Sequence, residues 1–159
     1  MFLALGSNQG DRAATLRAAY GRLRELLGEA VASGIYETEP MYVADQPRFL
    51  NAVCAWTTSL EPFELLGRPQ AIERELGRRR SVPKGPRAID IDSLLYGERR
   101  VAEPGLLVPH PGIHERAFVL APLLEIAPEL RDPVSGLPYR LSLDTVGLAG
   151  VSYVEPLDR

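Results

Sequence analysis

The sequence predicts an α+β fold in which helices pack on one sheet. Two stretches repeat apolar residues at helical spacing, and four shorter apolar runs have the length and residue types of strands. In chain order these segments give strand, helix, strand, strand, helix, strand. A chain of 159 residues that is 45% hydrophobic and 25% charged fits a single globular domain over residues 1–159.

The first half of the pattern begins almost at the first residue, with a short apolar strand over residues 2–6. The turn "GSNQGD" follows, and Asp11 is placed to cap a helix over residues 11–27 that ends at Gly28. A strand over residues 30–38 comes next, because this segment contains several β-branched residues.

The second half again consists of a strand, a helix and a strand. A loop bounded by Pro40 and Pro47 leads into a strand over residues 48–58. A helix then begins after Ser59 and runs to about residue 76, but Pro69 lacks an amide donor and is expected to kink or split it. A basic loop rich in glycine and proline precedes the fourth strand, residues 88–95.

A C-terminal extension completes the chain, with an apolar helical stretch near residues 116–126 and a last strand at 151–154. The order β-α-β-β-α-β is that of ferredoxin-like folds, in which we expect the helices to cover one face of the sheet.

Composition excludes several classes of protein. The net charge of −3 argues against general nucleic-acid binding. Cys54 is the only cysteine, so no disulfide forms within the chain, and it lies in an apolar run where a buried thiol is expected. The N-terminus lacks the basic region of a signal peptide, and no apolar run is long enough to span a bilayer. We therefore expect a cytoplasmic protein without a membrane partner.

Two carboxylates in the fourth strand are the strongest chemical signal. Asp90 and Asp92 are separated by one residue, so they share a face of the strand, with their Cα atoms roughly 6.5–7 Å apart. Ile89 and Ile91 point to the opposite face. Two ionised carboxylates this close repel each other unless a cation joins them, and Mg²⁺ is commonly held by one or two carboxylates, water and phosphates. Two solvated aspartates on an open face are the alternative.

A basic loop lies immediately before this strand. Arginine forks match phosphate oxygens, and a concentration of positive charge in one loop favours an anionic ligand, although a solvated loop is the alternative. A cation site beside such a loop indicates chemistry on a metal-bound polyphosphate. The chain has no P-loop motif. The basic residues are Arg78, Arg79, Arg80, Lys84 and Arg87.

Both histidines lie in the segment "VPHPGIHERAF". His110 and His114 have the spacing of zinc ligands on one helical face, but Pro111 and Gly112 between them argue against a continuous helix. A contact from His110 or Arg116 to phosphate fits the segment better.

Five segments occur in order between residue 2 and about residue 130: "LALGSN", "YET-P", "DQPRFLNAV", "GPRAIDID" and "VPHPGIHERAFVLAPLLEIAPEL". Together they resemble the 6-hydroxymethyl-7,8-dihydropterin pyrophosphokinase family of folate biosynthesis. The resemblance implies a ferredoxin-like core and transfer of the pyrophosphoryl group of ATP to the pterin hydroxymethyl group, with release of AMP and use of two Mg²⁺ ions.

The resemblance also implies roles for individual residues on the nucleotide side. Asp90 and Asp92 match the metal-binding pair, and two metals would stabilise the attacking and leaving oxygens. Arg78 and Arg87 match catalytic arginines on the polyphosphate, with Arg80 as a further loop arginine. Lys84 replaces a tryptophan often found in the family, and we expect it to contact phosphate. The positions that match the rest of the nucleotide site are Gln70, Glu73, Leu106, Leu107, His110 and Arg116.

On the pterin side, Phe49 and Phe118 are expected to stack on the two faces of the heterocycle, although such residues also occur in ordinary cores. Asn51 shares the face of Phe49 and is expected to pair with the ring edge. Glu39 stands where some family members have proline. The other expected pocket residues are Gly6, Thr38, Glu39, Pro40 and Met41.

The expected partners are therefore two small-molecule substrates, ATP and the pterin. The protein itself is expected to be a monomer. Two alternatives remain open at this point. A ferredoxin-like RNA-binding module would stack bases on Phe49, although the acidic pair and the missing RNP1 pattern disfavour it. A metal-dependent nucleotidyltransferase would use the same aspartates but release pyrophosphate.

Overall fold

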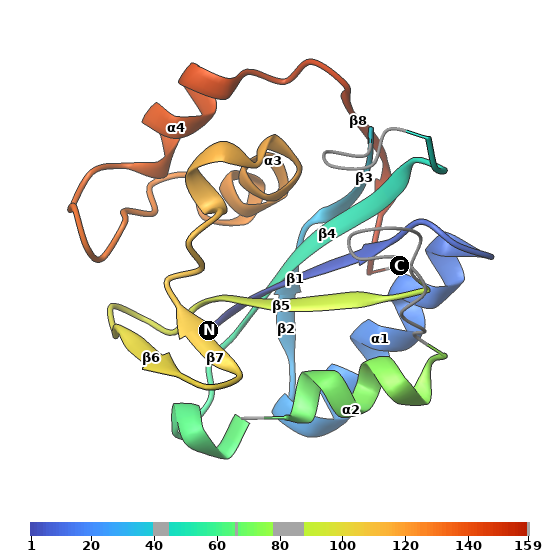
Figure 1. Ribbon diagram of the computed structural model, residues 1–159, viewed down its shortest axis with the longest axis horizontal. Helices are drawn as coiled ribbons and strands as arrows, with labels where there is room; N and C mark the ends of the chain where they lie inside the picture. The colour runs from blue at the N-terminus through green and yellow to red at the C-terminus, as the bar shows by residue number, and fades with distance from the viewer. Residues whose placement is uncertain (40–44, 66, 78–87, 159) are drawn as a thin grey trace.

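A six-stranded antiparallel sheet forms the centre of the molecule (Figure 1). The computed structural model describes residues 1–39, 45–65, 67–77 and 88–158. The strand order is β5-β1-β4-β3-β8, and β2 pairs with β4 beside β3. The strands are β1 (Phe2–Ser7), β2 (Ala30–Ala32), β3 (Gly34–Thr38), β4 (Phe49–Trp56), β5 (Asp90–Leu95) and β8 (Val151–Pro156).

The order of the first five strands, with the helices between them, is the predicted ferredoxin-like arrangement. The strand expected over residues 30–38 is divided into β2 and β3 at Ser33. The Ser33 hydroxyl accepts a hydrogen bond from the amide of Val53 over 2.9 Å and donates to the carbonyl of Gly34 over 2.7 Å. A side chain thus replaces one step of the backbone ladder, which interrupts the strand without separating it from β4.

Helix α1 (Arg12–Leu27) and helix α2 (Arg68–Glu75) cover one face of the sheet. As predicted, the Asp11 carboxylate caps α1 by accepting a hydrogen bond from the amide of Ala14 over 3.1 Å. Gly28 ends the helix at a φ of +92°, a conformation that residues with side chains rarely adopt.

The expected break in the second helical segment is present, but Pro69 does not cause it. A short 3₁₀ helix, η1 (Pro62–Leu65), is separated from α2 by Gly67, whose φ is +78°. Pro69 lies in the first turn of α2, where no intrahelical partner for its amide is required. The proline therefore starts α2 and leaves Gln70 and Glu73 in regular helix.

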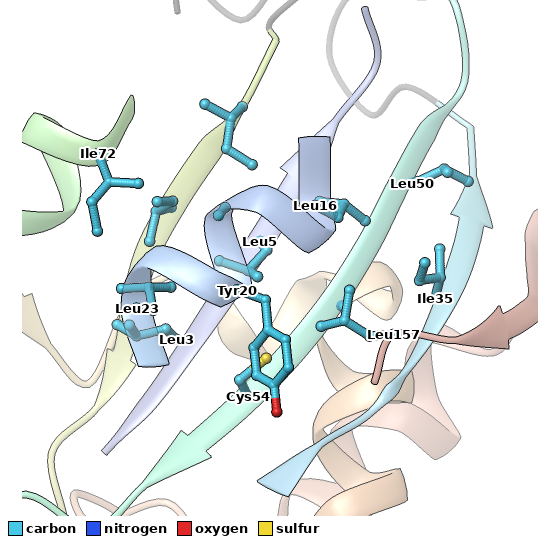
Figure 2. Close-up of a cluster of buried hydrophobic side chains, with 14 of the residues drawn as sticks. Leu3, Leu5, Leu16, Tyr20, Leu23, Ile35, Leu50, Cys54, Ile72 and Leu157 are labelled. Atoms are coloured by element: carbon cyan, nitrogen blue, oxygen red, sulfur yellow. The ribbon is translucent and has the colours of Figure 1, made fainter. Parts of the chain in front are cut away.

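The hydrophobic core on this face joins α1 and α2 to alternate residues of the strands. Figure 2 shows Leu16, Tyr20 and Leu23 of α1 packed over Leu3 and Leu5 of β1. Cys54 is fully buried in the same cluster, and burial raises the pKa of its thiol above the ordinary range. The predicted burial of this cysteine is thereby confirmed.

The opposite face is partly covered as well, so the expectation of helices on one face only was wrong. Helix α3 (Ala117–Ile126) packs over this face and helix α4 (Tyr139–Val146) packs against α3, giving three layers (Figure 1). Their apolar residues meet Val53 of β4 and Leu94 of β5. The Glu125 carboxylate, at the end of α3, accepts hydrogen bonds from the amide of Gly34 and, over 2.6 Å, from the hydroxyl of Tyr36.

A hairpin and two helices of the second half were not predicted from the sequence. Strands β6 (Val101–Glu103) and β7 (Leu106–Val108) form a small separate hairpin, and a 3₁₀ helix, η2 (Ile113–Glu115), precedes α3. The second of these helices is α4. The predicted helix near residues 116–126 and the last strand are both present. In the part of the chain that the structure describes, no helix is long and apolar enough to cross a membrane.

Candidate active site

The two aspartates lie on the part of the sheet that faces away from α1 and α2. Asp90 and Asp92 are partly exposed, whereas Ile91 between them is buried in the core with Ile89. The alternation predicted from the sequence is therefore confirmed. Leu94, the next residue on the same face as the aspartates, is buried under α3. The aspartates thus stand just beyond the edge of the area that α3 covers.

The backbone between the aspartates is held by α2. Glu73 is only 4% exposed, and its Oε2 accepts a hydrogen bond from the amide of Ile91 over 2.9 Å. Because β5 is an edge strand, this carboxylate takes the place that the carbonyl of another strand would have. Glu73 therefore fixes the backbone of the strand from which both aspartates project.

A row of residues crosses the sheet beside Asp90. Gly6 of β1 pairs with Asp90 on one side and with Asn51 on the other, and Asn51 pairs in turn with Tyr36. A Cβ atom on Gly6 would lie 3.0 Å from Oδ1 of Asn51. The absence of a side chain at Gly6 therefore lets the Asn51 amide lie close against the backbone of β1, next to the position paired with Asp90.

The Asn51 amide is oriented by a buried neighbour. Its Nδ2 donates to the hydroxyl of Thr38 over 2.6 Å, and both residues are buried. This bond leaves Oδ1 on the side of Gly6 as an acceptor for a ligand. Phe49 pairs with Thr38 in the sheet register, and its ring lies 3.8 Å from the Cβ position of Gly6. Four expected pocket residues, Gly6, Thr38, Phe49 and Asn51, are thus adjacent.

His110 follows a cis peptide bond between Val108 and Pro109. Its amide donates to the carbonyl of Leu94 over 2.8 Å, and its Nδ1 accepts from the amide of Gly112 over 2.9 Å. Burial, together with the positive charge of Arg116, lowers the pKa of the His110 imidazole. The neutral ring therefore carries its proton on Nε2, where it is a hydrogen-bond donor.

Arg116 and Phe118 lie at the start of α3. The guanidinium of Arg116 is 5.8 Å from the centre of the Phe118 ring, in a cation–π arrangement. A Cβ atom on Gly112 would lie 2.6 Å from Nε of Arg116, so the arginine packs on a position that has no side chain. His110, Arg116 and Phe118 therefore belong to one local cluster.

The remaining nucleotide-side candidates differ in their surroundings. Oε1 of Gln70 is buried and has no hydrogen-bond partner among the described residues. Leu106 is buried, but Leu107 is 51% exposed, because consecutive residues of β7 point to opposite sides. The expectation that both leucines pack beside one adenine ring stays a prediction. Glu39 is exposed and forms an ion pair of 3.2 Å with Arg48.

Several expected site residues lie outside the described part of the chain. On the phosphate side these are Arg78, Arg80, Lys84 and Arg87, together with Arg79 of the same loop. On the pterin side they are Pro40 and Met41.

The structure adds Tyr36 to the residues beside the pocket, next to Asn51 in the cross-strand row. Its burial and, to a smaller extent, its hydrogen bond to Glu125 raise the pKa of its hydroxyl above the ordinary range. The sequence contained a signal for this placement, because Tyr36 is two residues from Thr38 and so shares its face of the strand.

Comparisons with known proteins agree with this geometry. The family model for 7,8-dihydro-6-hydroxymethylpterin-pyrophosphokinase (HPPK) matches residues 2–128. The 2-amino-4-hydroxy-6-hydroxymethyldihydropteridine pyrophosphokinase of Bacillus subtilis is 48% identical over 131 residues, which cover 81% of this chain and 78% of that protein. The protein of the same name in Methylorubrum extorquens is 44% identical over 156 residues, 97% of this chain and 98% of its own length.

Longer proteins also match. The folic acid synthesis protein fol1 of Schizosaccharomyces pombe is 41% identical over 159 residues, 99% of this chain but only 22% of that protein. The chain therefore spans about a fifth of this fungal relative. A crystal structure of Plasmodium falciparum HPPK-DHPS with pteroate has a TM-score of 0.71 at 16% identity, covering 91% of this chain and 41% of that one, which shows a shared fold. The matched span and the bacterial relatives establish that the chain belongs to the HPPK family.

Proposed function

We propose that this chain transfers the pyrophosphoryl group of ATP to the hydroxymethyl oxygen of 6-hydroxymethyl-7,8-dihydropterin, as a step of folate biosynthesis. The new bond joins this oxygen to the β-phosphorus, and the hydroxyl proton is released. The bond that breaks joins the β-phosphorus to the oxygen bridging the α- and β-phosphates, so AMP leaves with that oxygen. The observation that carries the proposal is one sheet face on which Asp90 and Asn51 lie on either side of Gly6, in a chain of the HPPK family.

The pterin would lie on the floor formed by Gly6. The Asn51 Oδ1 is fixed as an acceptor and can receive a hydrogen bond from the edge of a heterocycle. Phe49 offers one stacking surface and Phe118, at the start of α3, would offer the other. α3 packs on this face of the sheet, which supports a pocket between the two elements. In the same pocket, roles for Glu39, Pro40 and Met41 rest on the resemblance of their segment to the family.

Asp90 and Asp92 fit a magnesium site. Their carboxylates are hard oxygen donors on one face of β5, next to Gly6 and Ala4, two residues that leave room beside them. Among the described residues there is no group of three or more potential metal ligands. A pair of carboxylates suits Mg²⁺, which takes its remaining ligands from water and substrate phosphates. When bound, the metal ions would neutralise charge on the phosphates and the leaving group.

The nucleotide would be bound at the neighbouring cluster. Neutral His110 presents its Nε2–H as a donor, and the guanidinium of Arg116 lies close by. The buried Oε1 of Gln70 is available to accept a hydrogen bond from a ligand. Positions Arg78, Arg80, Lys84 and Arg87 would bind and orient the phosphates, as the family resemblance implies. The monomeric state and the cytoplasmic location of the chain stay predictions.

The product nucleotide tests this proposal directly. Purified chain with ATP, Mg²⁺ and 6-hydroxymethyl-7,8-dihydropterin is expected to produce AMP and the pterin diphosphate in equal amounts, measured by anion-exchange chromatography. Release of ADP would indicate transfer of a single phosphoryl group. Release of pyrophosphate would indicate nucleotidyl transfer, and either result would contradict the proposal.

A further inference from the structure

A second cluster of polar side chains lies at the join between η2 and the C-terminal extension, outside the site described above. His114 of η2 has both ring nitrogens engaged. Its Nε2 is 2.8 Å from Oδ2 of Asp132, and its Nδ1 is 2.6 Å from the hydroxyl oxygen of Ser142 on α4. Its ring also packs on Tyr139, the first residue of α4, with ring centres 5.1 Å apart.

Asp132 is built into the structure as an ionised acceptor. It is 7% exposed, and its carboxylate also accepts hydrogen bonds from the amide of Val134 over 2.8 Å and the hydroxyl of Ser135 over 3.2 Å. Burial opposes its ionisation, but the bonds from Val134, His114 and Ser135 hold the pKa of this carboxyl below its usual value. Since a carboxylate only accepts, His114 donates to it from Nε2.

The third contact tolerates both charge states of the imidazole. A serine hydroxyl can donate to a neutral Nδ1 and can accept from a protonated one. The bonds of His114 to Asp132 and Ser142 are therefore compatible with either state. The cluster joins three separate segments: η2, the turn that holds Asp132, and α4.

The segment that His114 fixes carries expected ligand-binding residues at both ends. On one side His110 is held against β5 through its bond to Leu94. On the other side, Arg116 immediately precedes α3, which begins at Ala117, and Phe118 is the second residue of that helix. The bonds of His114 to Asp132 and Ser142 therefore connect the C-terminal extension to the middle of this segment, between His110 and Arg116.

We propose that the C-terminal extension works as part of the binding site, with His114, Asp132 and Ser142 as positioning residues for Arg116 and Phe118. The assignment rests on the proposed function, because it takes Arg116 as a nucleotide contact and Phe118 as a pterin contact. It gives a role to a region that lies beyond the residues matched by the family model.

The test compares two hydroxyl deletions on the same helix. Ser142→Ala removes the bond to His114, whereas Thr145→Ala removes a hydroxyl that donates only to the carbonyl of Leu141 within α4. His114→Ala removes the whole connection, and His114→Gln restores a side chain that both donates and accepts. Each variant is measured for KM and kcat with both substrates, for melting temperature, and for amide hydrogen exchange over residues 110–118.

We expect His114→Ala to raise both KM values about tenfold or more, since small displacements of binding groups have effects of this size. Ser142→Ala should act in the same direction, His114→Gln should recover part of the loss, and Thr145→Ala should stay within about twofold of the parent. Exchange over residues 110–118 should be faster in His114→Ala and Ser142→Ala only.

Unchanged KM values with a lowered melting temperature would overturn the proposal, because the cluster would then be merely structural. Unchanged exchange over residues 110–118 would overturn it as well, even in a chain without pyrophosphokinase activity. An inactive parent protein with faster exchange in the two variants would contradict the proposed function but retain His114 as the residue that holds this segment.

Discussion

The carboxylate of Glu73 and the amide of Ile91 are 2.9 Å apart, and this bond joins α2 to the middle of the strand that carries both aspartates. Ile91 is itself buried, so its side chain anchors the strand on one face while its amide is fixed at the edge. The positions of Asp90 and Asp92 are therefore set from two directions.

Replacing Glu73 with alanine should lower kcat/KM by about tenfold or more, because the strand that holds the aspartates loses its edge contact. The buried amide of Ile91 would also lose its partner, which should lower the free energy of unfolding by about 1–3 kcal/mol. Glu73→Gln keeps an acceptor and should retain most of the activity. Steady-state kinetics and urea unfolding measure both effects. Glu75→Ala, which removes an exposed ion pair with Arg22, is the matched control.

Asp92→Ala should reduce turnover by several orders of magnitude, since one of the two carboxylates of the proposed Mg²⁺ site is lost. Binding of the pterin alone should change much less, because Asn51 and Phe49 lie on another strand, β4. Isothermal titration with the pterin measures binding, and a steady-state assay measures turnover, so the two effects are determined separately. Asp144→Ala, on the exposed side of α4, should leave both unchanged. If pterin binding and turnover fall together in an unfolded protein, the assigned role is wrong.

Gly6→Ala should weaken pterin binding strongly. The new methyl group would lie 3.0 Å from Oδ1 of Asn51 and would occupy the floor on which the pterin is proposed to rest. We expect a rise in KM for the pterin of tenfold or more, with a smaller effect on KM for ATP. Gly21→Ala, in α1 with no atom within 4 Å of the new Cβ, provides the control and should raise stability by about 0.5–1 kcal/mol. Equal KM values for the pterin in Gly6→Ala and the parent would argue against binding of the pterin over Gly6.

Thr38→Val should remove the acceptor that orients the Asn51 amide while keeping the shape of the side chain. The buried Nδ2 would then be unsatisfied, at a cost of about 1–3 kcal/mol in the free energy of unfolding. KM for the pterin should rise several-fold, because the amide is no longer held with Oδ1 toward the ligand. Fluorescence titration with the pterin tests this, and unaltered affinity would show that Asn51 needs no such support.

The lowered pKa of His110 predicts a dependence of stability on pH. The folded protein binds a proton at this site less readily than the unfolded chain does, so the contribution of the neutral ring is complete above the unfolded pKa, near 6.5. It is lost as pH falls below that value toward the folded pKa. Urea unfolding between pH 5 and 8 should show the parent losing stability relative to His110→Gln as pH falls. If the difference in unfolding free energy between the parent and His110→Gln stays constant over this pH range, the prediction is contradicted.

Local periodicity was sufficient for the parts of the site that depend on one strand. The shared face of Asp90 and Asp92, and the burial of Ile89 and Ile91, follow from alternation within β5 and needed no knowledge of its neighbours. The cap at Asp11 and the end of α1 at Gly28 are equally local.

Features that depend on tertiary contacts could not be predicted from local periodicity. Nothing near Glu73 in sequence indicates that its carboxylate would replace a neighbouring strand, since that depends on β5 lying at the sheet edge. Ser33 divides a strand because its hydroxyl meets Val53 from another strand. The strands β6 and β7 have only three residues each, too few to establish a period.

The bond between Asn51 and Thr38 also limits what an inhibitor of this protein can look like. With one Nδ2 hydrogen directed to Thr38, the amide holds Oδ1 beside Gly6 as an acceptor, so the ligand atom opposite Oδ1 has to be a donor. A flat heterocycle with a carbonyl oxygen in place of an amino group at that point would set two acceptors against each other. Such a desolvated mismatch is rejected far more strongly than the loss of one methylene. Selective inhibitors designed for this site should therefore keep a donor opposite Oδ1 of Asn51 and vary elsewhere.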